Sequence, residues 1–354
     1  MKWEDNVRKV VPYVPGEQPK RRDIIKLNTN ECPYPPAPAI GEKLASYETE
    51  QLRLYPDPCV TALTESLADF YGVGKENVFV GVGSDDVLAM AFLTFFNSGK
   101  KILFPDITYS FYDVWADLYR IPYEVQPLDE NFCIRKEDYR KENGGIIFPN
   151  PNVPTGIEMN PDEIEEIVAN NPDVVVIVDE AYVDFGCQSA LPLIDKYENL
   201  LVVQTFSKSR ALAGIRIGYA FGSAKLIRYL NDVKFSFNSY TMNRLTELVG
   251  CTCLEDKAYF TECVQKVIAT RERSKQRLTE LGFSFGDSKA NFIFASHRSV
   301  PAKELFEALK EAGIYVRYFK KPRIDNYLRI SIGTDEQMDA MFAFLEQYLQ
   351  KREG

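Results

Sequence analysis

Residues 174–182, with the sequence VVVIVDEAY, decide the fold of this protein. Five consecutive β-branched residues precede a pair of carboxylates. Because the apolar run is continuous and does not alternate, we expect a strand buried on both faces, which is typical of a parallel sheet covered by helices. A carboxylate placed directly after such a strand is costly without a partner, so Asp179 is expected to hold a cation or a protonated ring nitrogen.

Similar apolar runs lie on both sides of this stretch and alternate with segments of helical spacing. The expected strands are 78–83, 101–105, 123–128, 145–151, 200–206 and 215–221, and the expected helices are 60–71, 85–97, 110–120, 161–170 and 223–235. Beyond them we expect a helical stretch over 241–281, strands at 292–295, 315–319 and 327–332, and helices at 303–311 and 335–350. The pattern predicts an α/β fold, with a mostly parallel sheet sandwiched by helices and a smaller α+β C-terminal domain.

The length of 354 residues is compatible with about two domains. We divide the chain into an N-terminal arm and small-domain segment (1–49), a large domain (50–240) and a small C-terminal domain (241–354). The Pro-rich arm is expected to pack on the small domain.

Composition limits the possible functions. The net charge of −9 gives no general surface for nucleic acid, and no apolar run approaches the length of a membrane span. The charged N-terminus lacks a signal-peptide pattern, which favours a soluble cytoplasmic protein. The seven cysteines are expected to be reduced, and because His297 is the only histidine, a His-rich metal centre is excluded and no metal site is predicted. We expect His297 to lie in a loop.

Groups that could carry chemistry follow the ends of several predicted strands, where ligands gather in parallel sheets. They are Ser84 and Asp85 at a helix start, Tyr109, the turn 150–156 with Asn152, and the group Ser207, Lys208 and Arg216. Taken singly, each has an ordinary structural explanation, such as a helix cap, a packing ring, a turn or an ion pair. Together with Asp179 they include an amine for an aldehyde, a carboxylate for a pyridine nitrogen and a phosphate site at a helix N-terminus. This combination describes a pyridoxal 5'-phosphate site.

Eight motifs in order then resemble a known family. They are PYVPG (12–16), LNTNECPYPP (27–36), YPDP (55–58), GVGSDDVL (81–88), PNVPTG (151–156), DEAYVDF (179–185), TFSKSRALAGIRIGY (205–219) and LRISIGT (328–334). They resemble fold-type-I pyridoxal-phosphate aminotransferases of class I and II, most closely the histidinol-phosphate aminotransferase group. The resemblance covers nearly the whole chain.

The resemblance implies roles for individual residues. Lys208 forms a Schiff base with the coenzyme, Asp179 pairs with its pyridine nitrogen, Tyr182 hydrogen-bonds its ring hydroxyl and Tyr109 stacks on its ring. The phosphate is surrounded by Ser84, Asp85, Thr205, Ser207 and Arg216. Tyr55 reaches the phosphate bound by a partner subunit, which implies a homodimer with shared active sites.

The chain departs from the family pattern at one position. The commonest turn has Asn immediately before Pro-Thr-Gly, where this sequence has Val153. Asn152, one position earlier, is the candidate to contact the ring hydroxyl in its place.

The substrate site is expected in the C-terminal domain. An arginine within an apolar strand is either a paired structural residue or an anion-binding fork. The resemblance favours the fork for Arg317 and Arg329, with Tyr13 and Asn238 as possible helpers.

The implied reaction is transamination between L-histidinol phosphate and 2-oxoglutarate in histidine biosynthesis. An aromatic amino-acid aminotransferase or a threonine-phosphate decarboxylase remains an alternative, because related enzymes share these motifs. Two other classes of protein are disfavoured. A pyridoxal-phosphate sensor fused to a DNA-binding module would need an extra basic helical segment, and none is left over. A nicotinamide-dependent oxidoreductase would need a full glycine fingerprint, which residues 81–86 lack.

Overall fold

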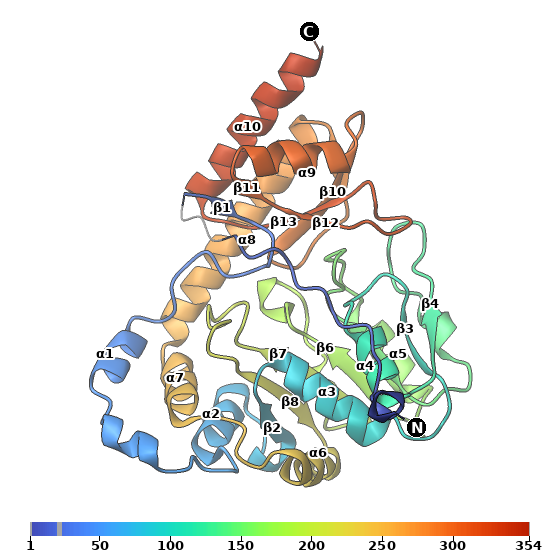
Figure 1. The fold of residues 1–354 in the computed structure, drawn as a ribbon, viewed down its shortest axis with the longest axis vertical. Coiled ribbons are helices and arrows are strands. Elements are labelled where there is room, and N and C mark those ends of the chain that lie inside the picture. The colour runs from blue at the N-terminus through green and yellow to red at the C-terminus, as the bar shows by residue number, and fades with distance from the viewer. Residues whose placement is uncertain (1, 20–22, 354) are drawn as a thin grey trace.

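The computed structural model describes residues 2–19 and 23–353. A larger part is built on a seven-stranded sheet, and a smaller part on a four-stranded sheet lies above it in the view of Figure 1. The expected α/β fold with a mostly parallel sheet and a smaller α+β unit is confirmed.

The large sheet contains every strand predicted between residues 78 and 222. The strand order is β2-β8-β7-β6-β5-β3-β4, and β8 alone runs antiparallel to its neighbours. The bounds are Val78–Gly81 (β2), Ile102–Pro105 (β3), Tyr123–Gln126 (β4), Ile146–Pro149 (β5), Val176–Asp179 (β6), Leu200–Thr205 (β7) and Gly218–Gly222 (β8).

Helices cover both faces of this sheet. One face packs against α2 (Thr61–Tyr71), α5 (Pro161–Ala169) and α7 (Arg244–Glu255), and the other against α3 (Ser84–Phe95), α4 (Tyr112–Tyr119) and α6 (Ala224–Phe237). In β6, Val176 and Val178 face the first layer while Ile177 faces the second, and all three are fully buried. Burial on both faces explains the continuous apolar run that marks this strand in the sequence.

The smaller part consists of a sheet and three helices around a separate core. The sheet order is β12-β13-β10-β9, all antiparallel. The bounds are Phe283–Phe285 (β9), Phe292–His297 (β10), Arg317–Tyr318 (β12), Leu328–Ser331 (β13), Lys257–Glu280 (α8), Ala302–Glu311 (α9) and Asp335–Glu353 (α10).

Residues 25–27 of the N-terminal arm join this smaller part. β1 (Ile25–Lys26) pairs in parallel with β11 (Ile314–Tyr315), and Leu27 lies in the core of the smaller part. The remaining elements are α1 (Ala39–Ala45) and the 3-10 helices Trp3–Asn6, Thr49–Arg53, Lys75–Asn77, Lys136–Tyr139, Val183–Phe185 and Leu191–Leu193.

Three local expectations differ from the structure. The helical stretch 241–281 is two helices, because the carboxylate of Asp256 accepts a hydrogen bond from the backbone N–H of Tyr259 and caps α8 (3.0 Å). α7 packs with the core of the large sheet, although the expected boundary at residue 240 places it in the small domain. His297 ends β10 and is not a loop residue, and its Nδ1 accepts the backbone N–H of Val300 at 3.1 Å.

The seven cysteines are free thiols. In the described ranges 2–19 and 23–353, no helix combines the length and apolar character needed to cross a membrane.

Candidate active site

A cavity of about 170 Å³ lies at the carboxyl ends of the central strands of the large sheet. Its walls come from the ends of β5 and β6, the loop after β7, the start of α3 and the N-terminal arm. The lining residues are Thr29, Glu31, Ser84, Asp85, Tyr109, Pro149, Val153, Asp179, Ala181, Tyr182, Ser207, Lys208, Ala213 and Arg216. Most of the groups predicted from strand ends therefore meet in one cavity, because parallel strands end at the same edge of a sheet.

Lys208 lies in the loop after β7 and lines the cavity with its amine. Its Nζ donates a hydrogen bond to the carbonyl oxygen of Thr29 (3.2 Å) and lies 5.4 Å from the ring centroid of Tyr182. Within the part of the chain that the structure describes, no carboxylate lies at ion-pair distance from this amine. The ion-pair explanation of Lys208 thus fails, and its amine is available to react with an aldehyde.

Asp179 ends β6 and is only 4% exposed. Its Oδ2 accepts a hydrogen bond from the Tyr112 hydroxyl (2.9 Å), and its Oδ1 accepts one from the backbone N–H of Ala181 (3.2 Å). Burial raises the pKa of this carboxyl to about 6, against these two hydrogen bonds, and the Asp85 carboxylate adds to the rise. A carboxylate in this environment requires a cationic partner, which a protonated ring nitrogen supplies.

The N-terminus of α3 and Arg216 form the anion-binding end of the cavity. Arg216 donates to Ser207 Oγ (3.3 Å) and lies 3.5 Å from Asp85. Gly83 occupies the N-cap position of α3 with φ +92°. The helix begins at Ser84, and no side chain caps its N-terminus. A Cβ at Gly83 would collide with the Arg216 guanidinium, so only glycine lets the cation reach the helix N-terminus. The free N–H groups and the guanidinium together fit a phosphate.

Tyr109 forms a wall shared by this cavity and the next one. Its hydroxyl donates to Asp85 Oδ1 (2.7 Å), and burial together with that carboxylate holds the pKa of the phenol well above its ordinary value. The ring is fixed edge-on against Tyr112, with the centroids 5.7 Å apart. A fixed aromatic wall next to Lys208 and Asp179 is suited to stacking a flat ring.

A second cavity of about 280 Å³ shares Lys208, Tyr182 and Tyr109 with the first and extends toward the smaller part. It brings together Tyr13, Arg317 and Arg329, three of the residues expected at the substrate site. The rings of Tyr13 and Phe111 stack with their centroids 4.1 Å apart, which fixes the arm at this wall.

The two arginines of this second cavity face each other across a pair of strands. Arg317 in β12 is the register partner of Arg329 in β13. Arg329 donates through Nη2 to the carbonyl of Asn28 (2.8 Å), and its buried Nε has no hydrogen-bond partner among the described residues. Burial, with a contribution from Arg317, lowers the pKa of Arg329. Two adjacent cations with an unused buried donor indicate an anionic ligand.

Four predicted site residues, Thr205, Tyr55, Asn238 and Asn152, lie outside both cavities. Thr205 is buried behind Ser207, where its Oγ1 accepts the backbone N–H of that serine (3.1 Å). Tyr55 is 77% exposed on the surface, with its ring 4.7 Å from that of Tyr240. Asn238, at the C-cap of α6, is exposed two residues before Tyr240. Tyr55 and Asn238 therefore line neither cavity of this chain.

Asn152 is also not directed into the coenzyme cavity, contrary to the expectation. Its amide donates to the carbonyl of Ile107 (3.0 Å) and to Thr155 Oγ1 (3.1 Å), and its Oδ1 accepts the Thr108 hydroxyl (3.2 Å). Val153 lines the coenzyme cavity, while Asn152 lines a separate one. The amide is fully used in holding the turn, so it does not replace the usual asparagine.

Several residues of the site were not singled out from the sequence. Tyr112 holds Asp179, and its spacing of three residues from Tyr109 along a predicted helix was the available signal. Asn28, Thr29 and Asn30 come from the arm and contact Arg329, Lys208 and Tyr182 respectively. All three lie in the LNTNECPYPP motif, but the motif does not give their contacts, because their partners lie more than 150 residues away in the chain.

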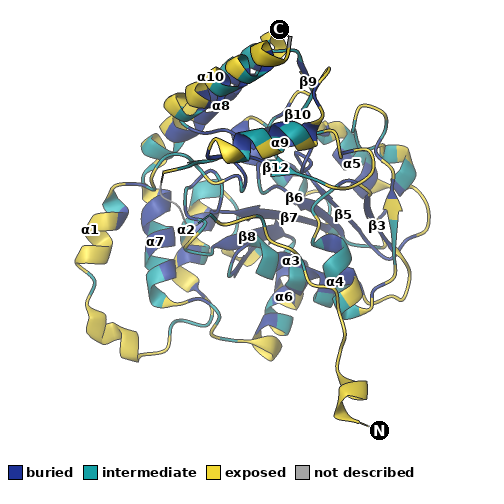
Figure 2. Ribbon diagram, turned by 45° about the horizontal axis from the view of Figure 1, so that its top comes forward, coloured by how far each residue is buried: buried dark blue, intermediate teal, exposed yellow. Residues whose placement is uncertain are grey.

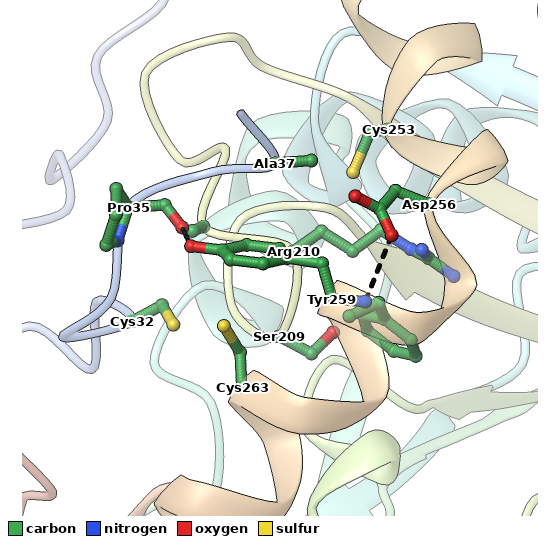
Figure 3. Close-up of a pocket in the computed structure, with 11 residues that line it drawn as sticks. Cys32, Pro35, Ala37, Ser209, Arg210, Cys253, Asp256, Tyr259 and Cys263 are labelled. Carbon is green, nitrogen blue, oxygen red and sulfur yellow. Dashed lines mark hydrogen bonds between the residues drawn. The ribbon is translucent and has the colours of Figure 1, made fainter. Parts of the chain in front are cut away.

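A third cavity, behind the lysine loop, is too small for a coenzyme. Figure 3 shows it between the arm, the loop around Arg210 and the junction of α7 and α8. Its volume is about 10 Å³, roughly that of one water molecule. Arg210 is 3% exposed beside it, with its guanidinium 4.1 to 5.0 Å from the ring centroids of Phe260, Phe70 and Phe206. This cage anchors the loop that carries Lys208.

Comparison with known proteins agrees with this geometry. The family model "Aminotransferase class I and II" matches residues 22–345. The chain belongs to the class I and II aminotransferase family. Members of this family use pyridoxal 5'-phosphate, and this protein is an aminotransferase.

Relatives of similar length carry a more specific name. The chain is 51% identical over 353 residues to a histidinol-phosphate aminotransferase of Lactococcus lactis, covering 100% of this chain and 98% of that protein. It is 51% identical over 336 residues to a protein of the same name from Brachyspira hyodysenteriae, covering 95% of each.

Solved structures are similar in fold at lower identity. The histidinol-phosphate aminotransferase of Sinorhizobium meliloti in complex with pyridoxal-5'-phosphate has a TM-score of 0.85 at 22% identity, covering 93% of this chain and 92% of that one. An L-threonine-O-3-phosphate decarboxylase of Porphyromonas gingivalis reaches a TM-score of 0.79 at 21% identity, covering 92% of this chain and 100% of that one. The fold is therefore common to enzymes that break different bonds, and it does not identify the substrate.

Proposed function

We propose that this protein transfers the amino group of L-histidinol phosphate to 2-oxoglutarate, forming imidazole acetol phosphate and glutamate in histidine biosynthesis. The observation that carries this proposal is the identity of about one half, over the full chain, to proteins named for that activity. The anion-binding arginine pair beside Lys208 supports it.

The residues of the first cavity fit pyridoxal phosphate. Asp179 would pair with the ring nitrogen, Tyr109 would stack on the ring, Tyr182 would hydrogen-bond the ring hydroxyl, and Arg216 with the N-terminus of α3 would bind the phosphate. When bound, the coenzyme supplies an aldehyde that captures the substrate amine and a ring that accepts an electron pair from the substrate α-carbon.

The chain itself supplies binding, orientation and proton transfer. The amine of Lys208 would remove a proton from the substrate α-carbon and return one on the coenzyme side, since among the described residues it is the only amine that lines both cavities. Asp179 keeps the proton on the ring nitrogen, because the buried carboxylate is stable only beside a cation. The hydroxyl of Tyr182 would hold the ring hydroxyl, and Tyr109 would support the face of the ring.

Arg317 and Arg329 bind the substrate anion. The phosphate of histidinol phosphate and a carboxylate of glutamate occupy this pair in turn during the two halves of the reaction. Both anions satisfy the buried Nε of Arg329 and reduce the repulsion between the two guanidinium groups.

The substrate assignment is tested by offering three donors in parallel. Purified holoenzyme is incubated with histidinol phosphate, phenylalanine or threonine phosphate, each with 2-oxoglutarate, and glutamate and carbon dioxide are measured. We expect glutamate to form fastest with histidinol phosphate and no carbon dioxide with any donor. A preference for phenylalanine would make the protein an aromatic aminotransferase, and carbon dioxide release from threonine phosphate would make it a decarboxylase.

We further infer that the protein is a homodimer whose active sites are shared. Large apolar side chains are exposed together around Tyr55, including Leu52, Leu54 and Tyr240. Arg244 holds this segment by donating to the carbonyl of Tyr55 (2.7 Å). Figure 2 displays α1 and the chain that follows it as largely exposed, as expected for a surface covered by a second copy.

Subunit complementation tests the shared site. A mixed dimer of Lys208→Ala and Tyr55→Ala subunits contains one intact site, because the Lys208→Ala chain donates its tyrosine to the other. We expect both parents to be impaired and the unfolded and refolded mixture to recover activity. A mixture no more active than its parents, or a monomer in sedimentation, would contradict this arrangement. A cytoplasmic location stays a prediction.

A further inference from the structure

Asn30 occupies a central position between the arm, the smaller part and the coenzyme cavity. It lies in the LNTNECPYPP segment, is 1% exposed and has a left-handed backbone conformation with φ 57°. Asparagine tolerates this conformation better than most residues do. Its side-chain Nδ2 lies 3.0 Å from the hydroxyl oxygen of Tyr182, 152 residues away.

The orientation of the Asn30 amide follows from its contacts with Ser331. The backbone N–H of Asn30 lies 3.0 Å from Ser331 Oγ, and Ser331 Oγ lies 2.8 Å from Asn30 Oδ1. A backbone N–H only donates, so the serine oxygen accepts that hydrogen bond and the serine hydrogen is free to bond Oδ1. In the structure the amide oxygen faces Ser331 and accepts this hydrogen, and the NH₂ group faces Tyr182.

This arrangement determines where the Tyr182 hydroxyl hydrogen points. Because the Asn30 NH₂ group donates to the hydroxyl oxygen, the tyrosine cannot donate its own hydrogen in that direction. Tyr182 lines both cavities, so the hydrogen is left to be donated into the site.

We propose that Asn30 is a positioning residue that makes Tyr182 a hydrogen-bond donor toward the coenzyme. The inference deepens the proposed function, on which it rests for the coenzyme but not for the substrate. The acceptor in the site is an oxygen with available lone pairs, as a ring hydroxylate provides.

The same residue connects this hydrogen bond to the substrate-binding strand. Ser331 is two residues from Arg329 in β13, and Asn291 Nδ2 donates to the backbone carbonyl of Asn30 at 3.0 Å. The backbone N–H, the backbone carbonyl and the amide oxygen of Asn30 are thus bonded to Ser331 and Asn291 of the smaller part. Its NH₂ group donates to Tyr182, which follows β6 of the larger part. Asn30 fixes the tyrosine only while the arm and the smaller part are in place.

Three substitutions test the orientation directly. Asn30→Asp keeps the shape and tolerates the backbone conformation but places an acceptor opposite Tyr182, so the hydroxyl turns toward it and away from the site. Asn30→Gly removes the side chain without backbone strain. Ser331→Ala removes the hydrogen bond that holds the amide orientation. Asn143→Asp is the matched control, because it alters another buried asparagine that is bonded to Asn171 (2.8 Å).

The measurements are the dissociation constant of pyridoxal phosphate for the apoprotein, the absorbance maximum of the bound coenzyme and the melting temperature. We expect Asn30→Asp and Asn30→Gly to weaken coenzyme binding about 3-fold to 10-fold, as for one lost hydrogen bond, and to shift the absorbance maximum. Ser331→Ala should weaken coenzyme binding and shift the absorbance maximum in the same direction, but to a smaller extent than the Asn30 substitutions. The control lowers the melting temperature alone.

A double-mutant cycle with Tyr182→Phe decides between orientation and a general effect of the new charge. If Asn30 acts through the hydroxyl, Asn30→Asp has no further effect on affinity or absorbance once the hydroxyl is gone. An equal effect in both backgrounds would overturn the proposal, as would a folded Asn30→Gly variant with the spectrum and affinity of the parent. None of these measurements uses a substrate, so a different amino donor would leave the result unaffected.

Discussion

Replacing Asp179 by asparagine is expected to stabilise the protein without coenzyme while weakening the loaded enzyme. Burial raises the pKa of this carboxyl from its ordinary value of 3.8 to about 6. At about 1.36 kcal/mol per pH unit, the ionised carboxylate destabilises the folded apoprotein by about 3 kcal/mol. Asparagine carries no charge, its Oδ1 accepts the backbone N–H of Ala181 and its NH₂ group donates to the Tyr112 hydroxyl oxygen, so this destabilisation is removed.

The pH dependence of the effect follows from the two pKa values. Above about pH 6 the carboxyl is ionised in both the folded and the unfolded chain, and the folded apoprotein bears the full cost of burying the charge. As the pH falls from 6 toward 4, the folded state binds a proton before the unfolded state does, and the cost disappears. The stabilising effect of Asp179→Asn on the apoprotein should therefore be present at pH 7.5 and nearly absent at pH 4.

The loaded enzyme should respond in the opposite direction. A protonated ring nitrogen gives the carboxylate its missing partner, so the coenzyme recovers the energy that burial costs the apoprotein. We expect the asparagine variant to bind pyridoxal phosphate about 100-fold more weakly, corresponding to about 3 kcal/mol.

Urea denaturation of the apoprotein at several pH values, together with coenzyme titration at pH 7.5, measures both effects. Tyr112→Phe is the control, because it removes a hydrogen bond from the carboxylate while keeping the charge, and it should destabilise the apoprotein. An asparagine variant less stable than the parent at pH 7.5, or a difference that does not change with pH, would refute the reasoning.

Three further changes test other parts of the site. Lys208→Ala should abolish turnover and the absorbance band of the lysine-bound coenzyme together, and normal turnover would contradict the assignment. Arg329→Gln should lower kcat/KM by about 30-fold to 1000-fold, corresponding to a loss of about 2 to 4 kcal/mol for charge-assisted hydrogen bonds, with little change in coenzyme affinity measured by titration. Gly83→Ala should weaken coenzyme binding by at least about 10-fold, since φ +92° is strained for alanine and its Cβ displaces Arg216, and equilibrium dialysis of the folded variant checks this.

The central part of the fold and site was predictable from the sequence for a local reason. Strand ends such as Asp179 and Lys208 are marked by the apolar runs before them, and the edge of a parallel sheet then collects them. The burial of Val176, Ile177 and Val178 on two faces follows from one uninterrupted β-branched run. Resemblance added the roles of these residues, and the cavity brings most of them together.

The wrong predictions concern residues whose positions are not set by strand alternation or helical spacing. Asn152 and Val153 lie in a turn, so their directions depend on contacts with residues near 107 and 155 and not on strand alternation. The expected domain boundary at residue 240 separates α7 from the large sheet, against which it packs. An amphipathic helix shows the same sequence pattern whichever of the two cores it covers, so the pattern does not assign α7 to a domain. Asn238 lies exposed at the C-cap of α6, away from the cavity where it was expected, and the role of Tyr55 stays a prediction.

The sequence by itself determined the alternation of strands and helices, the positions of Lys208 and Asp179 at strand ends and the two arginines of the C-terminal strands, since short-range backbone geometry and burial set these patterns. Tertiary structure alone decided that Asn30 meets Tyr182, that Arg317 stands opposite Arg329 and that Asn152 turns away from the coenzyme. The hydrogen bonds of Asn30 and Asn152 join residues 152 and 45 positions apart, and the arginine pair depends on the register of two strands. Each depends on a few ångströms of packing that no local pattern records.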